Sequence, residues 1–304
     1  SAKPDEPGEE IPEAPDQVDE IQRQLLEKKQ VVFYGPPGTG KTYTAERFAK
    51  WWVGQQDGGD AVSDRVATVT FHPSFTYEDF IEGLTADATE SGSVTYDVED
   101  GVLKHVAEDA NDALEATPAG ERAPPFVLII DEINRGNLAQ IFGEVITLLE
   151  ADKRGSFEVE LAHSGDSFTL PPNLYIIGTM NTADQSISLV DTALRRRFRF
   201  IDFPPNLDVV SEQYDTIDAG MEPEELLTAP TGVVSDRDRL LAASILAIDE
   251  LNERILDAAQ LGKGKQLGHT YLLEHDSKAA VVDAWRFDIL PQLEEYYFGQ
   301  LDRL

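Results

Sequence analysis

A glycine-rich octapeptide constrains this chain more than any other feature. It reads Gly35, Pro36, Pro37, Gly38, Thr39, Gly40, Lys41 and Thr42. In such a loop the glycines let successive backbone N–H groups turn around a phosphate, the lysine reaches the terminal phosphates and the threonine hydroxyl ligates Mg²⁺. An apolar run, residues 31–34, precedes the loop, and a stretch of helical character, residues 42–53, follows it. A strand, this loop and a helix predict a P-loop nucleotide site, to which we also assign the adjacent Tyr43.

Further apolar runs predict a parallel sheet behind this loop. Including the run before the loop, the predicted strands are residues 31–34, 66–71, 126–130, 175–179 and 198–203. Stretches with helical periodicity are residues 18–26, 103–114 and 138–149. Near-continuous apolar strands separated by helices are typical of a parallel sheet covered on both faces. The predicted fold class is therefore α/β, with a hairpin over residues 155–170 inserted before the fourth strand.

The pattern divides the 304 residues into three parts. Residues 1–17 are rich in Pro, Glu and Asp and predict an acidic linker, which either follows a preceding segment or is a simple disordered N-terminus. Residues 18–205 form the large α/β nucleotide-binding domain. Residues 206–304 predict a small helical domain, because helical periodicity over 240–256 and 279–293 is followed by no convincing strand.

The charge of the chain limits its partners. There are 57 Asp and Glu against 25 Lys and Arg, a formal net charge of −32. A negative electrostatic potential repels nucleic acid and anionic membranes, so we expect no direct binding of DNA by this chain. The acids are spread along the chain, which favours a surface adapted to high salt over an acidic face for a basic partner. The absence of cysteine, and of any apolar run long enough to span a membrane, predicts a soluble cytoplasmic protein.

Two acidic residues directly follow the third predicted strand. Asp131 and Glu132 come after five apolar residues, where a side chain emerges beside the phosphate loop of an α/β sheet. Asp131, together with Thr42, is expected to hold Mg²⁺, and Glu132 to polarise the attacking water. Alone, such a pair is more often a helix cap or a solvated turn. The preceding P-loop favours the catalytic interpretation.

Polar residues near the last two predicted strands complete the candidate site. Asn181 follows the fourth strand, where an amide can contact a γ-phosphate and its water, although a turn asparagine is the alternative. The basic cluster Arg195, Arg196 and Arg197 lies just before the fifth strand. Arginines at a helix C-terminus often serve only the helix dipole. In a chain so poor in basic residues, we favour an arginine that acts across a subunit boundary, without choosing among the three.

Several motifs resemble the AAA+ superfamily and, within it, the McrB-type GTPase subunit of restriction systems that cut modified DNA. They are residues 71–83 (FHPSFTYEDFIEG), 131–137 (DEINRGN), 180–186 (MNTADQS), 193–198 (ALRRRF) and 268–271 (GHTY). The resemblance covers nearly everything after the linker. It departs at Pro73, where a polar residue is expected, and at Gln185, where arginine is familiar.

The resemblance implies a nucleotide-driven, ring-forming, hexameric motor with Mg²⁺ as its cofactor. It implies GTP rather than ATP as substrate and a McrC-like endonuclease subunit as partner. It also implies a motor that translocates DNA, with the DNA recognised by an N-terminal domain that this sequence does not contain. Asn181 and Asp184 would position the attacking water or the arginine of the neighbouring subunit. Nothing between the motifs identifies the purine base, so an ATP-using relative stays open.

Other interpretations remain beside this one. A MoxR-like ATPase that remodels proteins suits residues 131–135, although the 180–186 motif disfavours it, and a nucleotide-gated scaffold is the non-enzymatic alternative. His72 and His269 are each expected to be structural, as lone histidines in loops usually are. Trp51 and Trp52 predict core or subunit interface rather than a platform for stacking bases.

Overall fold

The computed structural model describes residues 11–57, 62–88, 94–183, 192–213, 222–230, 232–258 and 261–298. These residues form two compact units. The first, here the core unit, comprises residues 11–34, the described part of 42–180, and 192–201. The second, here the lid unit, comprises residues 35–41, 181–183 and the described part of 202–298, so that it contains the P-loop together with the C-terminal helices.

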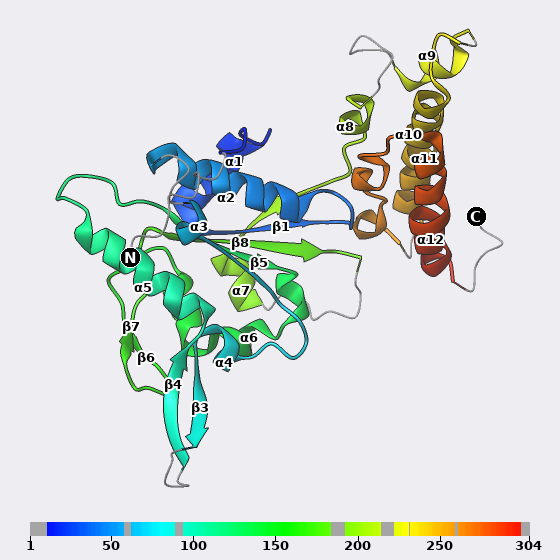
Figure 1. Cartoon of the computed structure of the whole chain (residues 1–304). Coiled ribbons are helices and arrows are strands. Elements are labelled where there is room, and N and C mark those ends of the chain that lie inside the picture. The colour runs from blue at the N-terminus through cyan, green and yellow to red at the C-terminus, as the bar shows by residue number, and fades with distance from the viewer. Residues whose placement is uncertain are drawn as a thin grey trace. The chain divides into compact units, whose positions relative to one another are not determined.

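A five-stranded sheet forms the centre of the nucleotide-binding fold (Figure 1). Its order is β2 (Val66–Thr70), β5 (Phe126–Asp131), β8 (Leu174–Asn181), β1 (Gln30–Gly35) and β9 (Arg199–Asp202). β5 runs parallel to β2 and to β8, with Ile129 opposite Thr68 and Ile177. All five predicted strands are confirmed within a few residues. Since β1, β5 and β8 are neighbours or next neighbours, the segments that follow them in sequence can contribute to one site.

Helices cover the sheet on both sides, as predicted. α1 (Val18–Lys28) and α2 (Lys41–Asp57) lie on one side in Figure 1, and α5 (Val102–Ala116) and α6 (Leu138–Phe142) lie on the other. Alternate residues of β5 explain this arrangement, because Leu128 and Ile130 are fully buried in the same cluster as Leu103 of α5. The short helices are α3 (Val62–Arg65), α4 (Tyr77–Phe80), the 3₁₀ turn Ile133–Arg135 and α7 (Thr192–Arg197).

The helix expected over residues 138–149 is wrong in its second half. α6 ends at Phe142, and the chain continues as a 3₁₀ helix, Gly143–Leu149. Gly143 has a φ of 48°, a left-handed conformation that interrupts an α-helix. A Cβ at this position would lie 3.0 Å from the ring of Tyr77, so the same glycine also permits a close contact.

Two hairpins extend from the core unit. The predicted hairpin before the fourth strand is confirmed as β6 (Val159–Glu160) paired antiparallel with β7 (Ser167–Phe168). A second hairpin, β3 (Glu82–Ala88) paired with β4 (Val94–Asp100), was not predicted. It lies between α4 and α5 in sequence and extends away from the sheet (Figure 1).

The C-terminal part of the lid unit is helical, as predicted. Its helices are α8 (Asp208–Ser211), α9 (Pro223–Thr228), α10 (Asp236–Asp257), α11 (Lys278–Ala284) and α12 (Leu290–Tyr296), with 3₁₀ turns Lys263–Lys265 and His269–Leu272. No strand follows β9 among the described residues. A π-helical turn, Trp285–Ile289, interrupts the helix predicted over 279–293. It precedes Pro291, which lacks a backbone donor and so breaks the regular ladder.

The segment before α1 runs against α2. Residues 11–17 contain no helix or strand. The Arg47 Nε donates a hydrogen bond to the Glu13 carbonyl oxygen (2.8 Å), and the Ile11 side chain lies against Gly54. This part of the expected linker therefore contacts the core unit.

Candidate functional site

The P-loop has the backbone that its glycines predict. Gly38 and Gly40 both have φ of 74°, a conformation that residues with a Cβ rarely adopt. Lys41 is buried, and its Nζ donates to the carbonyl oxygens of Pro36 (2.6 Å) and Gly35 (3.2 Å) and to the Thr39 Oγ1 (3.3 Å). The ammonium group is thus held against the loop from which phosphates would be bound.

The outer side of the P-loop is packed against the turn that carries the 268–271 motif. The Thr270 N–H donates to the Gly38 carbonyl oxygen (2.9 Å). A Cβ on Gly38 would lie 2.7 Å from the Tyr271 ring. A Cβ on Gly268 would lie 1.9 Å from the Gly38 carbonyl oxygen and 2.5 Å from that of Pro37. Only glycine permits these approaches, and the contact between this turn and the P-loop was not predicted.

His269 belongs to the same turn and lies near Gly40 of the P-loop. It is buried, its Nδ1 accepts a hydrogen bond from the Asn206 N–H (3.1 Å), and its Nε2 would stand 3.9 Å from a Cβ on Gly40. Accepting that bond fixes the neutral tautomer, with the proton on Nε2. Burial also lowers the pKa of His269. The histidine is thus part of the packing around the P-loop, in keeping with the structural role expected of it.

Two threonine hydroxyls contact Asp131, the acidic residue that ends β5. The Thr42 Oγ1 donates to the Asp131 Oδ1 (2.7 Å), and the Thr179 Oγ1 donates to the same oxygen (2.5 Å). Thr42 is the last residue of the P-loop and the second residue of α2, whereas Thr179 belongs to β8, the strand next to β5. The two expected magnesium ligands are therefore in direct contact. Thr179 was missed, although its place near the end of a predicted strand was a usable signal.

Glu132 has an unusual backbone. Its φ of 53° and ψ of 44° are left-handed, which costs a residue with a side chain about 1–2 kcal/mol. The Glu132 N–H donates to the Thr179 Oγ1 (3.2 Å), and its carboxylate pairs with the Arg135 guanidinium (3.3 Å). Strain of this kind concentrates at functional positions. Arg135, a residue of the 131–137 motif for which no role was predicted, thus joins the site.

The fourth strand ends beside the start of the P-loop. Asn181 is the last residue of β8 and is half-buried. The next residue, Thr182, donates its N–H to the Gly35 carbonyl oxygen (3.0 Å) and its Oγ1 to the Gly264 carbonyl oxygen (3.2 Å). The main chain after β8 is thereby tied to the first residue of the P-loop. Asp184 and Gln185 lie outside the described residues.

The three arginines of the basic cluster differ in their surroundings. Arg197 is mostly buried, pairs with Glu150 (2.9 Å) and offers its carbonyl oxygen to the Gln30 side chain. Arg195 is exposed and lies over the Phe200 ring at 5.6 Å from its centroid. Arg196 is exposed, and no ion pair or ring contact joins it to another described residue. Arg197 therefore stabilises its own subunit, whereas Arg195 and Arg196 face solvent.

The oxygen atoms around Asp131 fit a magnesium ion in type. Hydroxyl and carboxylate oxygens are its preferred protein ligands, and Mg²⁺ at phosphate sites takes its other ligands from water and phosphate. Within the described part of the chain, no group of three or more His, Asp or Glu side chains is arranged to hold a metal by itself. The Thr42 hydroxyl and the Asp131 carboxylate thus fit the protein ligands of a magnesium ion whose other ligands are water and phosphate.

Three other side chains were singled out from the sequence. Tyr43 is 66% exposed on α2 and receives a hydrogen bond from Arg47 (3.3 Å). His72 is exposed and meets Phe75 edge-on, so it is not packed in the interior. Trp52 is buried against Phe48 and Tyr175, which confirms the core assignment for this residue.

No helix in the described ranges is long and apolar enough to cross a bilayer.

Comparison with known proteins agrees with this geometry. Residues 30–198 match the family described as AAA domain (dynein-related subfamily), and residues 243–304 match the family described as McrB, alpha-helical lid domain. The sequence is 36% identical over 292 residues to the Type IV methyl-directed restriction enzyme EcoKMcrB subunit of Escherichia coli (strain K12), covering 92% of this chain and 56% of that protein.

A second relative comes from another bacterium. The sequence is 32% identical over 196 residues to the Type II restriction enzyme BsuMI component YdiS of Bacillus subtilis (strain 168), covering 56% of this chain and 55% of that protein. The chain thus spans little more than half the length of either relative. With an AAA domain followed by a McrB lid, the chain belongs to the McrB type of the AAA+ family.

Proposed function

We propose that this chain is the nucleotide-hydrolysing motor subunit of a restriction system, with GTP as its substrate. The contact between Thr42 and Asp131 is the observation that carries the hydrolytic part, because it joins the end of the P-loop to the end of β5. The biological part rests on the two relatives, whose names describe a restriction enzyme subunit and a restriction enzyme component.

Each residue of the site has a proposed role. Lys41 exchanges its carbonyl partners for the β- and γ-phosphate oxygens of the nucleotide. Thr42 and Asp131 hold Mg²⁺, which supplies charge neutralisation at the phosphates when it is bound. Thr179 orients the Asp131 carboxylate through its 2.5 Å hydrogen bond. These groups position the phosphates and leave the activation of water to another residue.

Glu132 is the proposed residue for activating water. Its carboxylate accepts a proton from the attacking water and orients it toward the γ-phosphate. The left-handed backbone of Glu132 supports this role, because strain of this kind clusters at active sites. Asn181 and Asp184 are proposed to orient the same water or the arginine that approaches from the next subunit.

The exposed arginines are proposed to act in trans, in a ring that is a hexamer. An arginine supplied across a subunit boundary raises the rate of phosphoryl transfer by about 10³–10⁵. Arg196 is the better candidate, since Arg195 lies over Phe200 and Arg197 pairs with Glu150. Isolated subunits are therefore expected to bind nucleotide and to hydrolyse it slowly.

The remaining parts of the proposal concern partners and setting. A McrC-like endonuclease subunit would stimulate hydrolysis, and DNA would be recognised by a domain outside this sequence and then translocated. The net charge of −32 supports the assignment of DNA recognition to another domain, because it opposes direct binding of DNA by this chain. The same charge supports a cytoplasm of high salt as the setting.

Nucleotide competition tests the proposal. Hydrolysis of GTP is measured with excess ATP in molar salt, alone and with a McrC-like subunit, on wild type and on the Lys41→Ala variant. We expect GTP turnover that resists ATP, increases with the partner and vanishes in Lys41→Ala. Efficient inhibition by ATP would overturn the choice of GTP, and turnover that persists in Lys41→Ala would overturn the assignment of the site.

A further inference from the structure

The β3–β4 hairpin, here the ribbon (residues 82–88 and 94–100), carries an apolar face that the core unit does not cover. Antiparallel register places Leu84 opposite Val98 and Ala86 opposite Tyr96. Directly opposed residues share a face, so these side chains and Val94 form one surface. Leu84, Val94, Tyr96 and Val98 are 53%, 57%, 68% and 39% exposed. Four large apolar side chains side by side in solvent are typical of an interaction site.

The root of the ribbon is fixed to the core unit. Glu82 is fully buried and accepts hydrogen bonds from the backbone N–H groups of His163 and Ser164 (2.9 Å each), in the turn of the β6–β7 hairpin. Lys104 pairs with Glu82 (3.4 Å) and with Asp100 (2.6 Å). A two-stranded ribbon is marginally stable alone, and this buried network holds one end of it in place. The contacts of Glu82 and Lys104 thus hold the base of the ribbon against the core unit, while its apolar face stays exposed.

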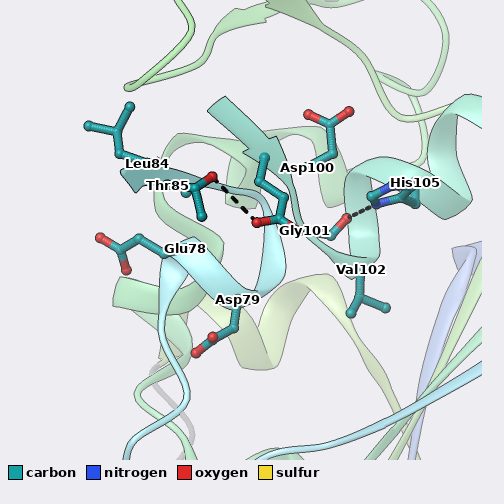
Figure 2. A pocket seen from close by; sticks show the side chains of 10 residues that line it. Glu78, Asp79, Leu84, Thr85, Asp100, Gly101, Val102 and His105 are labelled. Atoms are coloured by element: carbon teal, nitrogen blue, oxygen red, sulfur yellow. Dashed lines mark hydrogen bonds between the residues drawn. The ribbon is translucent and has the colours of Figure 1, made fainter. Parts of the chain in front are cut away.

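An acidic cleft of about 620 Å³ adjoins the ribbon at this root (Figure 2). Its lining includes the carboxylates Glu78, Asp79, Glu99 and Asp100, and Leu84 of the apolar face borders it. The sequence contains no lysine or arginine between Arg65 and Lys104. The same interval holds eight acids: Glu78, Asp79, Glu82, Asp87, Glu90, Asp97, Glu99 and Asp100. The positive charge of Lys104 is already paired.

We propose that the ribbon is a docking surface for a partner polypeptide that presents apolar side chains next to arginine or lysine. The apolar face receives the apolar side chains, and the acidic cleft receives the basic ones. Duplex DNA fits neither part, because its phosphates are repelled and its grooves offer little apolar surface. A second copy of the same surface would bring acid against acid. In molar salt, where the Debye length is about 3 Å, burial of the apolar face supplies most of the binding energy, so basic and acidic peptides are compared at low salt, where both parts of the surface contribute.

Fluorescence anisotropy on the whole chain tests this proposal. The probes are a short labelled peptide of alternating leucine and arginine, the matching leucine–glutamate and serine–arginine peptides, and a labelled DNA duplex. We expect the leucine–arginine peptide to bind, and the double variant Tyr96→Ser/Val98→Ser to weaken it by about tenfold or more. The control Phe287→Ser removes an aromatic side chain that is 62% exposed in the lid unit, and its affinity should equal that of wild type.

Three results of the binding measurements would overturn the proposal. They are equal peptide binding by wild type and the ribbon variant, equal binding of the leucine–glutamate or serine–arginine peptide, and DNA binding that depends on Tyr96. Loss of self-association in the ribbon variant, measured by sedimentation, would assign the surface to a second copy instead and so also overturn it. Hydrogen exchange on wild type gives an independent measurement, with slower exchange expected over residues 94–100 when the peptide binds. GTP hydrolysis without partner should be unchanged in the variant, so failure here is distinguishable from failure of the proposed function.

Discussion

Gly268 lies so close to Gly38 that a Cβ built on it would stand 1.9 Å from the Gly38 carbonyl oxygen. The neighbouring Thr270 N–H donates to that oxygen at 2.9 Å, so the two segments are joined through their backbones. The P-loop therefore cannot change shape without displacing the 268–271 turn. We therefore expect movements of the 268–271 turn and of the P-loop to be coupled by this direct contact.

Gly268→Ala tests this coupling. The added methyl group must push the Gly38 carbonyl away, which distorts the loop that binds phosphate. We expect the affinity for a fluorescent GDP analogue to fall by about tenfold or more, equivalent to about 1.4 kcal/mol. The control is Gly120→Ala, where a Cβ meets nothing within 4 Å but the φ of 94° strains an added side chain, so this variant reports backbone strain without a displaced neighbour. Unchanged affinity in a folded Gly268→Ala variant would show that the loop tolerates the displacement.

Glu132→Gln should separate binding from hydrolysis. The amide keeps the size of the side chain but cannot accept a proton from water. We expect nucleotide affinity within about threefold of wild type and a loss of kcat of about 10² or more. Lys41→Ala, in contrast, should abolish binding itself. Isothermal titration and single-turnover hydrolysis provide the two readouts, and parallel losses of binding in both variants would contradict the roles assigned to them.

Arg196→Ala and Arg197→Ala are expected to fail in different ways. Arg197 pairs with Glu150 and is mostly buried, so its loss should lower the melting temperature of the isolated subunit. Arg196 is exposed and should leave stability within about 0.5 kcal/mol of wild type. Its loss should instead reduce hydrolysis in the assembled ring by about 10³ while sparing binding. Mixing Arg196→Ala subunits with Lys41→Ala subunits should restore part of the activity, since each supplies what the other lacks.

The sequence predicted the sheet and much of the site because local signals decide both. Buried strands such as residues 126–130 are continuous apolar runs, and the P-loop needs its glycines in fixed places. The end of β5 then locates Asp131. The error at residues 138–149 has a local cause as well, because the left-handed φ of Gly143 interrupts a pattern that is otherwise helical.

Other features depend on contacts between distant segments and could not be predicted. The packing of Gly268 on Gly38 joins residues 230 positions apart in sequence. The ribbon was missed for a different reason. Val94, Tyr96 and Val98 alternate as a strand should, but their apolar side chains remain exposed, and an alternation rule that assumes burial gives no reason to place a hairpin there.

His269 gives the lid a pH dependence that can be measured. Burial lowers its pKa below the 6.5 of the unfolded chain, and its Nδ1 accepts the Asn206 N–H in the neutral state. Below pH 6.5 the unfolded state therefore binds more protons than the folded state does. The contribution of neutral His269 to folding stability is thus fully present above pH 6.5 and is lost as the pH decreases toward the folded pKa.

His269→Asn retains an acceptor but cannot titrate. We expect the melting temperature of wild type to fall more steeply between pH 7 and about pH 5.5 than that of His269→Asn. The exposed His72→Asn variant is the control and should keep the steep decline of wild type. Identical slopes for His269→Asn and wild type would mean that protonation of His269 does not weaken the folded lid unit.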